Sequence, residues 1–119
     1  MSQTPKQHKG KYGEALALQF LEERGYTCRE QNYRHGRSEI DLIMEKGELL
    51  VFVEVKYRRS DAFGLPETSV SQTQQQAIER AAVAYIEDQD WPGDLRFDII
   101  AILHPPKTTP RLRHFEDAF

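Results

Sequence analysis

The stretch Ser38-Glu-Ile-Asp-Leu-Ile-Met-Glu-Lys-Gly-Glu-Leu-Leu-Val-Phe-Val-Glu-Val-Lys-Tyr57 decides the fold of this chain. Its first part, Glu39 to Glu45, alternates in the way that is typical of a half-buried strand. Its last part, Leu49 to Tyr57, is rich in β-branched residues and predicts a second strand. Lys46-Gly47 is typical of a tight turn, so we expect an antiparallel hairpin. The alternation gives the first strand two faces: Ile40, Leu42 and Met44 on one, and Glu39, Asp41 and Ile43 on the other.

Helical and extended patterns surround this hairpin. Apolar side chains recur at helical spacing from Gly10 to about Arg24 and from about Ser71 to Glu87. The other segments predict strands at Tyr26 to Tyr33 and Arg96 to Leu103, a basic loop at Arg34 to Ser38, a loop at Asp61 to Glu67, and an added edge strand within Arg111 to Phe119. The order α-β-β-β-α-β predicts an α/β fold, a mixed β-sheet flanked by helices. We expect residues 1–9 to be a flexible basic lead-in and residues 10–119 to be a single domain.

Charge is distributed unevenly along the 119 residues. The formal net charge is −3, which by itself would argue against a nucleic-acid partner. However, residues 1–60 carry 11 basic and 9 acidic side chains, whereas residues 61–119 carry 5 and 10. No apolar run approaches the roughly 18 residues of a membrane span, and the first ten residues lack a signal-peptide core. A single cysteine, Cys28, excludes a disulfide framework and a multi-thiolate zinc site. We therefore expect a cytoplasmic protein that contacts no membrane.

One face of the predicted hairpin gathers charged side chains. The predicted turn places Asp41 opposite Phe52, and it places Glu39 opposite Glu54. Asp41 and Glu54 are then diagonal neighbours, about 7–8 Å apart. Alternation adds Lys56 to the same face. Opposed like charges destabilise a sheet, so this arrangement is unfavourable unless a cation lies between the carboxylates. The alternative is that Glu39 and Lys56 lie at strand ends, in water.

The carboxylates of this face suit a hard divalent cation. Glu54 interrupts an apolar strand, where a buried unpaired charge would be strongly destabilising. Mg²⁺ takes oxygen ligands, usually one or two carboxylates together with waters. Asp41 and Glu54 can supply the carboxylates, and the backbone carbonyl of Val55 is a candidate third ligand. We expect Mg²⁺, or Mn²⁺ in its place, as the cofactor.

Glu14 is an acidic residue within an apolar arc. On the wheel of the first predicted helix it falls between Ala17, Leu18 and Leu21. Two interpretations stay open. Glu14 is in the first turn, near the positive end of the helix dipole, if the helix begins near Gly10. Otherwise it points from the core face at a group that requires a carboxylate.

A series of motifs runs along the chain from about Gly10 to Phe119. The motifs are Gly10-Lys-Tyr-Gly13-Glu14, Ala17, Phe20-Leu21, Gly25-Tyr26, Asn32-Tyr33-Arg34, Glu39-Ile-Asp41-Leu-Ile, Phe52-Val-Glu54-Val-Lys56, Phe63-Gly64, Arg96-Phe97-Asp98 and Asp117-Ala-Phe119. In this order and with these gaps, the chain resembles the bacterial YraN family. The resemblance implies a restriction-endonuclease-like fold of the Asp…Glu-X-Lys nuclease superfamily, similar to archaeal Holliday-junction resolvases. Because the family is largely uncharacterised, it implies a nuclease-type site and not a proven activity.

The resemblance also implies roles for the residues of the charged face. Asp41 matches the metal-binding Asp, and Glu54 and Lys56 match the Glu-X-Lys pair. Glu14 matches the first-helix Glu that completes resolvase-like sites. Glu39 matches the acid of the family's Gly-Glu-Ile-Asp stretch, and we treat it as a supporting residue.

The chain departs from the family pattern at two positions. Ser38 stands where that stretch usually has Gly, and Gln74 stands where the second helix often carries Lys. Gln75 retains the neighbouring Gln of the pattern, and both glutamines are candidate supporting residues. Losing the Lys would weaken a phosphate contact near the site. Gln74 has a second interpretation, because Ser71 and Gln74 have the spacing of a capping box, which favours a helix cap.

A metal-dependent endonuclease is the function that these residues favour. We expect metal-assisted hydrolysis of phosphodiester bonds, and the resemblance implies branched DNA as the substrate. The expected catalytic residues are Glu14, Asp41, Glu54 and Lys56, and four arginines are expected to hold flanking phosphates: Arg34, Arg37, Arg58 and Arg59. Two alternatives stay open: a nucleic-acid-binding module that keeps the fold without the chemistry, and a purely structural adaptor. Resolvase-like relatives act as dimers, so a homodimer is a further open expectation.

Overall fold

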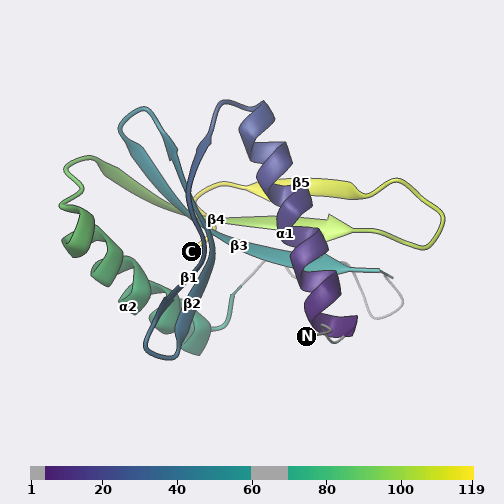
Figure 1. The fold of residues 1–119 in the computed structure, drawn as a ribbon, viewed down its shortest axis with the longest axis horizontal. Coiled ribbons are helices and arrows are strands. Elements are labelled where there is room, and N and C mark those ends of the chain that lie inside the picture. The colour runs from purple at the N-terminus through teal and green to yellow at the C-terminus, as the bar shows by residue number, and fades with distance from the viewer. Residues whose placement is uncertain (1–4, 60–69) are drawn as a thin grey trace.

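The secondary structure follows the predicted order. The computed structural model describes residues 5–59 and 70–119. Its elements are α1 (Pro5–Glu23), β1 (Thr27–His35), β2 (Ser38–Lys46), β3 (Leu49–Arg58), α2 (Gln72–Gln89), β4 (Asp94–Leu103) and β5 (Arg111–Phe115), as Figure 1 shows. The order is confirmed, and β5 is the added edge strand. The predicted loop from Asp61 to Glu67 lies outside the described residues.

Helix α1 is longer than predicted. It begins at Pro5, whereas the sequence pattern indicated a start near Gly10. Proline is well tolerated in the first turn of a helix, where its missing N–H has no intrahelical partner in any case. The helical start therefore overlaps the segment expected to be a lead-in.

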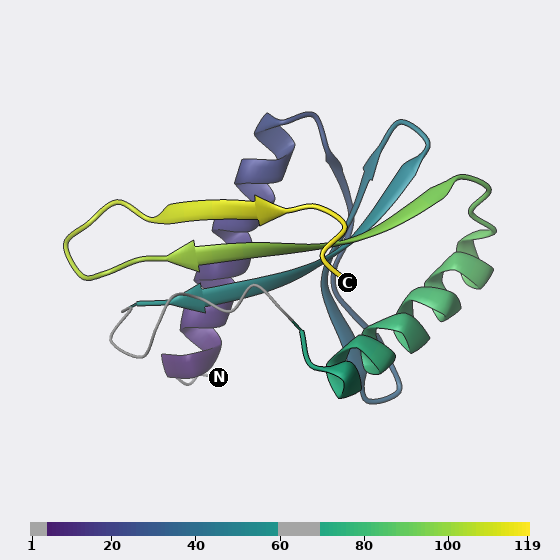
Figure 2. The same ribbon diagram turned by 180° about the vertical axis from the view of Figure 1, so that it is seen from behind.

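The five strands form one mixed sheet in the order β1-β2-β3-β4-β5. β3 and β4 pair in parallel, and all other neighbours pair antiparallel. A parallel pair requires a long crossover connection, which contains α2. Figure 1 shows α1 crossing in front of β3, β4 and β5, and Figure 2 shows these strands from behind, with α1 beyond them. The predicted α/β class, a mixed sheet flanked by helices, is confirmed.

A helix buries each face of the sheet. The α1-side core consists of Ala17, Leu21, Tyr26, Leu42, Met44, Val51, Val53, Ile100 and Ile102. The α2-side core consists of Ile40, Ile43, Leu50, Phe52, Val70, Ile78, Ala81, Ala82, Tyr85 and Ile99. Because β2 and β3 are covered on both faces, charged side chains within them, such as Asp41 and Glu54, are at least half-buried. In the part of the chain that the structure describes, no helix is long and apolar enough to cross a membrane.

The turn between β2 and β3 lies one residue further along the chain than predicted. Lys46 pairs with Leu49, so the turn is Gly47-Glu48 and not Lys46-Gly47. Gly47 has a φ of 61°. A type II′ turn places glycine at the first central position, where φ is positive. The position of the glycine therefore decides the turn.

This turn shifts the hairpin register by two residues. Ile43 pairs with Phe52, so the predicted pairing of Asp41 with Phe52 is wrong. The predicted pairing of Glu39 with Glu54 is wrong for the same reason. A shift by an even number of residues keeps side chains on their faces. The pairing of β2 with β3 ends at Leu42 and Val53, one residue before Asp41 and Glu54 would oppose each other.

The alternation of β2 is interrupted near Asp41. Ile40 packs in the α2-side core, whereas the alternation predicts it on the face of Leu42. The neighbouring strand β1 is irregular at the same level, because Asn32, across from Asp41 in the β1–β2 register, has a left-handed φ of 54°. Asparagine adopts this conformation more readily than most residues. The irregularity lies next to the charged side chains of the hairpin.

Candidate metal centre

Three acidic side chains meet where β2 and β3 stop pairing. The β2–β3 ladder extends to the Leu42–Val53 pair. Beyond it, the β1–β2 hairpin and β3 run apart, as Figure 1 shows, and we call this place the fork. Here carboxylate oxygens of Glu14, Glu39 and Asp41 all lie within 4.8 Å of one another. We call these three residues the acid cluster. Its oxygen donors can hold a divalent cation.

Asp41 bonds to the backbone of β3. The Val55 N–H donates to Asp41 Oδ2 at 2.8 Å, which takes the place of a ladder hydrogen bond at the fork. The neighbouring Glu54 is largely buried, with 12% of its side chain exposed. The charge of Glu54 acts on Asp41, so the two residues lie near each other, but Glu54 is not among the three carboxylates that lie within 4.8 Å of one another. Their shared role as metal ligands stays a prediction. The predicted role of the Val55 carbonyl as a metal ligand stays a prediction.

The first turn of α2 holds the Glu-X-Lys pair. Gln74 Nε2 donates to Glu54 Oε1 at 3.0 Å, and Lys56 Nζ donates to Gln74 Oε1 at 3.4 Å. Lys56 Nζ also lies 3.9 Å from Glu54 Oε1. An amide can donate and accept at the same time, so Gln74 can join a carboxylate to an ammonium. We call Glu54, Lys56 and Gln74 the clamp.

The capping-box interpretation of Gln74 is half right. Ser71 is the N-cap of α2, and its Oγ accepts from the Gln74 N–H at 3.2 Å. The side chain of Gln74, however, belongs to the clamp and not to the cap. Gln75 Nε2 donates to the Val70 carbonyl at 2.9 Å, so the Gln75 side chain holds the chain segment that enters α2.

Burial and mutual repulsion disfavour ionisation of the carboxyl groups. Burial first, and then repulsion from Glu54, raise the pKa of Asp41 to about 8. Burial also raises the pKa of Glu54, although the charge of Lys56 opposes this effect. Burial raises the pKa of Glu14, against a hydrogen bond from the Asn32 side chain. These carboxyl groups therefore lack sufficient nearby positive charge, which a divalent cation would supply.

Glu14 belongs to the acid cluster and not to the start of α1. Because the helix begins at Pro5, Glu14 lies in its third turn, beyond the reach of the N-terminal dipole. The first-turn interpretation is therefore wrong. Glu14 instead points into the fork, as the second interpretation predicted.

Sequence reasoning assigned no separate role to Asn32, which contacts Glu14. One signal was available, because asparagine is depleted in strands and stands inside the predicted strand from Tyr26 to Tyr33. Its left-handed backbone places it across from Asp41. A polar residue that is unusual within a predicted strand can therefore indicate a contact with a nearby acidic site.

The predicted phosphate-binding arginines lie on both arms of the fork. Arg34 Nη2 lies 2.9 Å from Glu39 Oε2, and 75% of the Arg34 side chain is exposed. Arg37 is exposed in the β1–β2 turn. Arg58 ends β3, and the exposed Arg59 follows it. Arg34 is therefore joined to the acid cluster, and phosphate binding by the four arginines stays a prediction.

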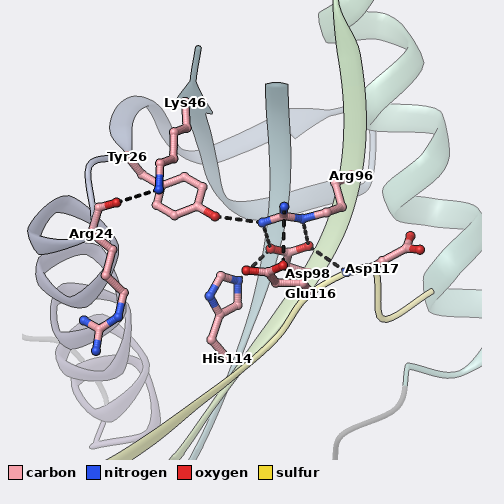
Figure 3. Close-up of polar contacts among 8 residues, drawn as sticks. All are labelled: Arg24, Tyr26, Lys46, Arg96, Asp98, His114, Glu116 and Asp117. Carbon is pink, nitrogen blue, oxygen red and sulfur yellow. Dashed lines mark hydrogen bonds and ion pairs between the residues drawn. The ribbon is translucent and has the colours of Figure 1, made fainter. Parts of the chain in front are cut away.

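Asp98, a buried aspartate on β4, has surroundings opposite to those of Asp41 (Figure 3). It is fully buried, and its Oδ1 and Oδ2 accept from Nε and Nη2 of Arg96, each at 2.8 Å. His114 Nε2 lies 2.6 Å from Oδ2, and the Asp117 N–H donates to Oδ1 at 3.0 Å. Burial alone would raise the pKa of Asp98, but hydrogen bonds with His114 and Arg96 lower it. This aspartate is stable as an anion.

The Asp98 network ties the last residues of the chain to the sheet. Arg96 Nη2 also donates to Tyr26 Oη at 2.8 Å. Next to the network, the Ala118 N–H donates to the Phe97 carbonyl at 2.7 Å, and the ring centroids of Phe97 and Phe119 are 5.4 Å apart. The last two motifs of the sequence pattern therefore form one structural unit.

Comparison with known proteins identifies the family. The sequence profile of uncharacterised protein family UPF0102 matches residues 13–102. The chain belongs to UPF0102. The resemblance to the YraN family, which is the same family, is thereby confirmed.

Relatives of this UPF0102 chain are similar over most of their length. A UPF0102 protein of Geotalea daltonii is 40% identical over 111 residues, which cover 92% of this chain and 87% of the relative. A UPF0102 protein of Flavobacterium psychrophilum is 41% identical over 110 residues, with 92% of each chain covered. Among solved structures, Hjc of Archaeoglobus fulgidus, a Holliday junction resolvase, aligns with 20% identity and a TM-score of 0.47, covering 87% of this chain and 72% of that chain.

Proposed function

We propose that this UPF0102 protein is a metal-dependent endonuclease that hydrolyses phosphodiester bonds of DNA, with branched DNA as its substrate. The observation that carries the proposal is the acid cluster, three carboxylates within 4.8 Å of one another, beside a clamp that contains a lysine. Phosphodiester hydrolysis requires charge stabilisation at the phosphate and an activated water, which such groups supply together with a metal ion. The resemblance to Asp…Glu-X-Lys nucleases supports the same chemistry.

The donor set fits a hard divalent cation. Glu14, Glu39 and Asp41 offer carboxylate oxygens, which Mg²⁺ and Mn²⁺ prefer. The pKa of Asp41, raised to about 8, is that of a group whose charge is not compensated by its protein neighbours. Asp41 and Glu54 stay the ligands predicted from the sequence, and Glu14 and Glu39 extend the set that would hold the ion.

The other groups would act on the phosphate. When bound, Mg²⁺ supplies a Lewis acid that lowers the pKa of a water molecule and offsets negative charge. The Lys56 ammonium, held by Gln74 Oε1, would stabilise the charge that builds on the phosphoryl oxygens. Gln74 also fixes the carboxylate of Glu54, so the positions of the acid and the lysine depend on the same amide.

The two arms of the fork would position the DNA. Arg34 and Arg37 on the β1–β2 hairpin, and Arg58 and Arg59 at the end of β3, would bind phosphates on either side of the acid cluster. Such contacts orient a nucleic acid without reading its sequence. They also make binding depend on salt.

A homodimer is part of this proposal. Cutting a branched substrate on two strands requires two sites, and one chain supplies one acid cluster in the part that the structure describes. Light scattering after size-exclusion chromatography measures the mass. A monomeric mass both with and without DNA would exclude the dimer.

A cleavage assay tests the proposed activity. Duplex, single-stranded, flap and four-way DNA are incubated with the protein in Mg²⁺, Mn²⁺ or EDTA. We expect metal-dependent cleavage of flap or four-way DNA, reduced at least about 100-fold in Asp41→Asn and Glu54→Gln. Glu30→Gln, an exposed acid on β1, is the matched control and should cleave normally.

Two results would overturn the proposal in different ways. Salt-sensitive binding that Asp41→Asn leaves unchanged, without cleavage of any substrate, would identify the binding-module alternative. The absence of both binding and cleavage would identify the structural adaptor. Titration calorimetry with Mn²⁺, in the presence of DNA, measures whether the acid cluster binds the metal.

A further inference from the structure

Three aromatic side chains, from α1, from β3 and from the residue that follows β4, contact one another. The Tyr12 ring is nearly parallel to the His104 imidazole, with centroids 5.7 Å apart and an interplanar angle of 27°. It is perpendicular to the Tyr57 ring, with centroids 6.0 Å apart. We call Tyr12, Tyr57 and His104 the aromatic platform. Tyr12 is 43% exposed, whereas the other described Phe, Tyr and Trp side chains are buried or half-buried.

Hydrogen bonds fix the positions of the Tyr57 and His104 side chains of the platform. Tyr57 Oη and His104 Nδ1 are 2.9 Å apart, and His104 Nε2 lies 3.0 Å from the Thr108 carbonyl oxygen. A carbonyl oxygen can only accept, so Nε2 carries a hydrogen, and Nδ1 of the neutral ring accepts from Tyr57. The His104 N–H also donates to the Arg58 carbonyl at 2.8 Å. The imidazole under Tyr12 is therefore fixed in position and orientation.

Gly13 sets the distance between the platform and the acid cluster. A Cβ at this position would lie 2.9 Å from the Tyr57 Cβ, so α1 approaches β3 as closely as a glycine permits. The residues on either side of Gly13 then point in different directions, because two residues are separated by about 200° around a helix. Tyr12 reaches His104, and Glu14 reaches the acid cluster.

The platform is thus connected to the acid cluster through α1 and to the clamp through β3. Tyr57 directly follows Lys56 of the clamp on β3. One cation acts on the platform: the charge of Arg59 acts on the Tyr57 phenol, where it opposes the effect of burial on the phenol pKa. Lys11 precedes Tyr12 in the sequence, and its charge acts on Glu14 of the acid cluster. An exposed aromatic ring with cations nearby suits a nucleotide, which offers a base to stack on and a phosphate to pair with.

We propose that the aromatic platform stacks an unpaired nucleobase of the DNA whose phosphate lies at the acid cluster. This inference rests on the proposed function, because it places the base beside the phosphate to be cut. Every base has a π-face, so the platform selects unpaired structure and not sequence. The bases of an intact duplex are covered by their neighbours, so the platform favours flaps and junctions with open nucleotides over continuous duplex.

Binding in EDTA tests the platform independently of cleavage. The probe is a flap DNA with 2-aminopurine at the first unpaired nucleotide, and a duplex without unpaired bases is the reference. We expect the wild type to quench the 2-aminopurine fluorescence by stacking. Tyr12→Ala should remove the quenching and raise the flap Kd about five- to hundredfold, with the duplex Kd changed less than about twofold.

Two variants control this result. Tyr12→Phe keeps the ring and should bind and quench like the wild type. Leu95→Ala removes another exposed apolar side chain, 44% exposed at the opposite end of β4 from His104, and should have no effect. Tyr12→Ala binding the flap as tightly as the wild type, with the quenching retained, would overturn the platform.

The same proteins in Mg²⁺ separate this inference from the proposed function. Cleavage by the wild type, with no effect of Tyr12→Ala on flap binding, would leave the nuclease standing and remove the platform. Tyr12-dependent quenching without cleavage by the wild type would leave the platform standing and remove the nuclease. The absence of any DNA binding would overturn both.

Discussion

Asp41, which is half-buried, and Asp98, which is fully buried, are two aspartates on the same sheet with opposite surroundings. Asp98 is bonded to Arg96, to His114 and to a backbone N–H, and these bonds lower its pKa. Asp41 accepts one backbone N–H and otherwise faces acids, and its pKa is raised to about 8.

The difference indicates a structural role for Asp98 and supports the proposed metal-binding role of Asp41. A protein gains stability when it satisfies a buried charge, as it does at Asp98. Leaving a carboxylate among other carboxylates away from water reduces stability, and such an arrangement is typical of a site whose cation comes from outside the chain.

Removing the Asp98 carboxylate should have the largest effect on stability. Asp98→Ala leaves Arg96 and His114 buried without their anion, which is expected to reduce the free energy of unfolding by about 3–5 kcal/mol. Urea denaturation measures the change. Asp94→Ala, an exposed aspartate on the same strand, is the control and should change stability little. If Asp98→Ala is too unstable to purify, Asp98→Asn should also lower the free energy of unfolding. Wild-type stability in either variant would contradict the structural role.

A divalent cation should have the next largest effect, and only through Asp41 and its neighbours. At a Mg²⁺ or Mn²⁺ concentration of 100 times Kd, ligand binding adds about 2.7 kcal/mol to the stability of the wild type. A thermal unfolding assay with and without the ion measures this gain as a rise in Tm. Asp41→Asn should lose most of the gain, and Asp94→Asn should keep it. An equal Tm rise in Asp41→Asn would place the ion elsewhere.

Asp41→Asn should stabilise the metal-free protein in a pH-dependent manner. Because the pKa of Asp41 is raised to about 8 from its ordinary 3.8, the protonated carboxyl is favoured by the fold. Its contribution is complete below about pH 4 and is lost as the pH rises through about 8. At pH 8 the variant should be about 1–2 kcal/mol more stable than the wild type, and at pH 4 about equally stable.

The pH dependence of Asp98 should have the opposite sign. Its pKa is lowered, so its contribution is present above the ordinary value of 3.8 and is lost as the pH falls through the lower pKa of the folded state. Unfolding measured in EDTA from pH 2 to 9 in the wild type, Asp41→Asn and Asp98→Asn separates the two slopes. A loss of stability with rising pH in Asp41→Asn equal to that of the wild type would contradict the assignment.

The smallest effects should come from the first turn of α2. Ser71→Ala removes an N-cap and should reduce stability by about 1 kcal/mol without changing the cleavage rate. Gln74→Ala removes the amide that holds Glu54 and Lys56, and it should reduce cleavage about 10- to 100-fold with little change in stability. Parallel cleavage and urea measurements on both variants test this. If both variants lose stability and both cleave at the wild-type rate, the side chain of Gln74 acts in the helix cap and not in the clamp.

The sequence predicted those parts of the site that follow from strand periodicity. Alternation placed Glu54 and Lys56 on one face of β3, and both contact Gln74 of α2. Alternation did not indicate the interruption of β2 near Asp41, where Ile40 packs in the α2-side core. The register itself depends on which turn position Gly47 occupies, and a Lys-Gly pair does not specify that.

Contacts between distant segments could not be predicted from periodicity. The start of α1 at Pro5 decided the role of Glu14, and helix boundaries are the part of secondary structure that a sequence pattern specifies least reliably. The contact of Gln74 with Glu54 depends on how α2 docks on the sheet. The Asp98 network joins Tyr26 to two residues near the end of the chain, and nothing local in the sequence indicates that pairing.

The fork also has a consequence for the order of folding. The β2–β3 hairpin is local and can form within about 1–10 μs, while Asp41 and Glu54 are still hydrated. Their repulsion becomes strong only when α1 and α2 dock and remove this water, and we expect this docking to follow hairpin formation because it joins distant segments of the chain. Without an ion, the repulsion therefore acts on the native state more than on the transition state. A bound cation should accordingly slow unfolding and leave the rate of refolding almost unchanged.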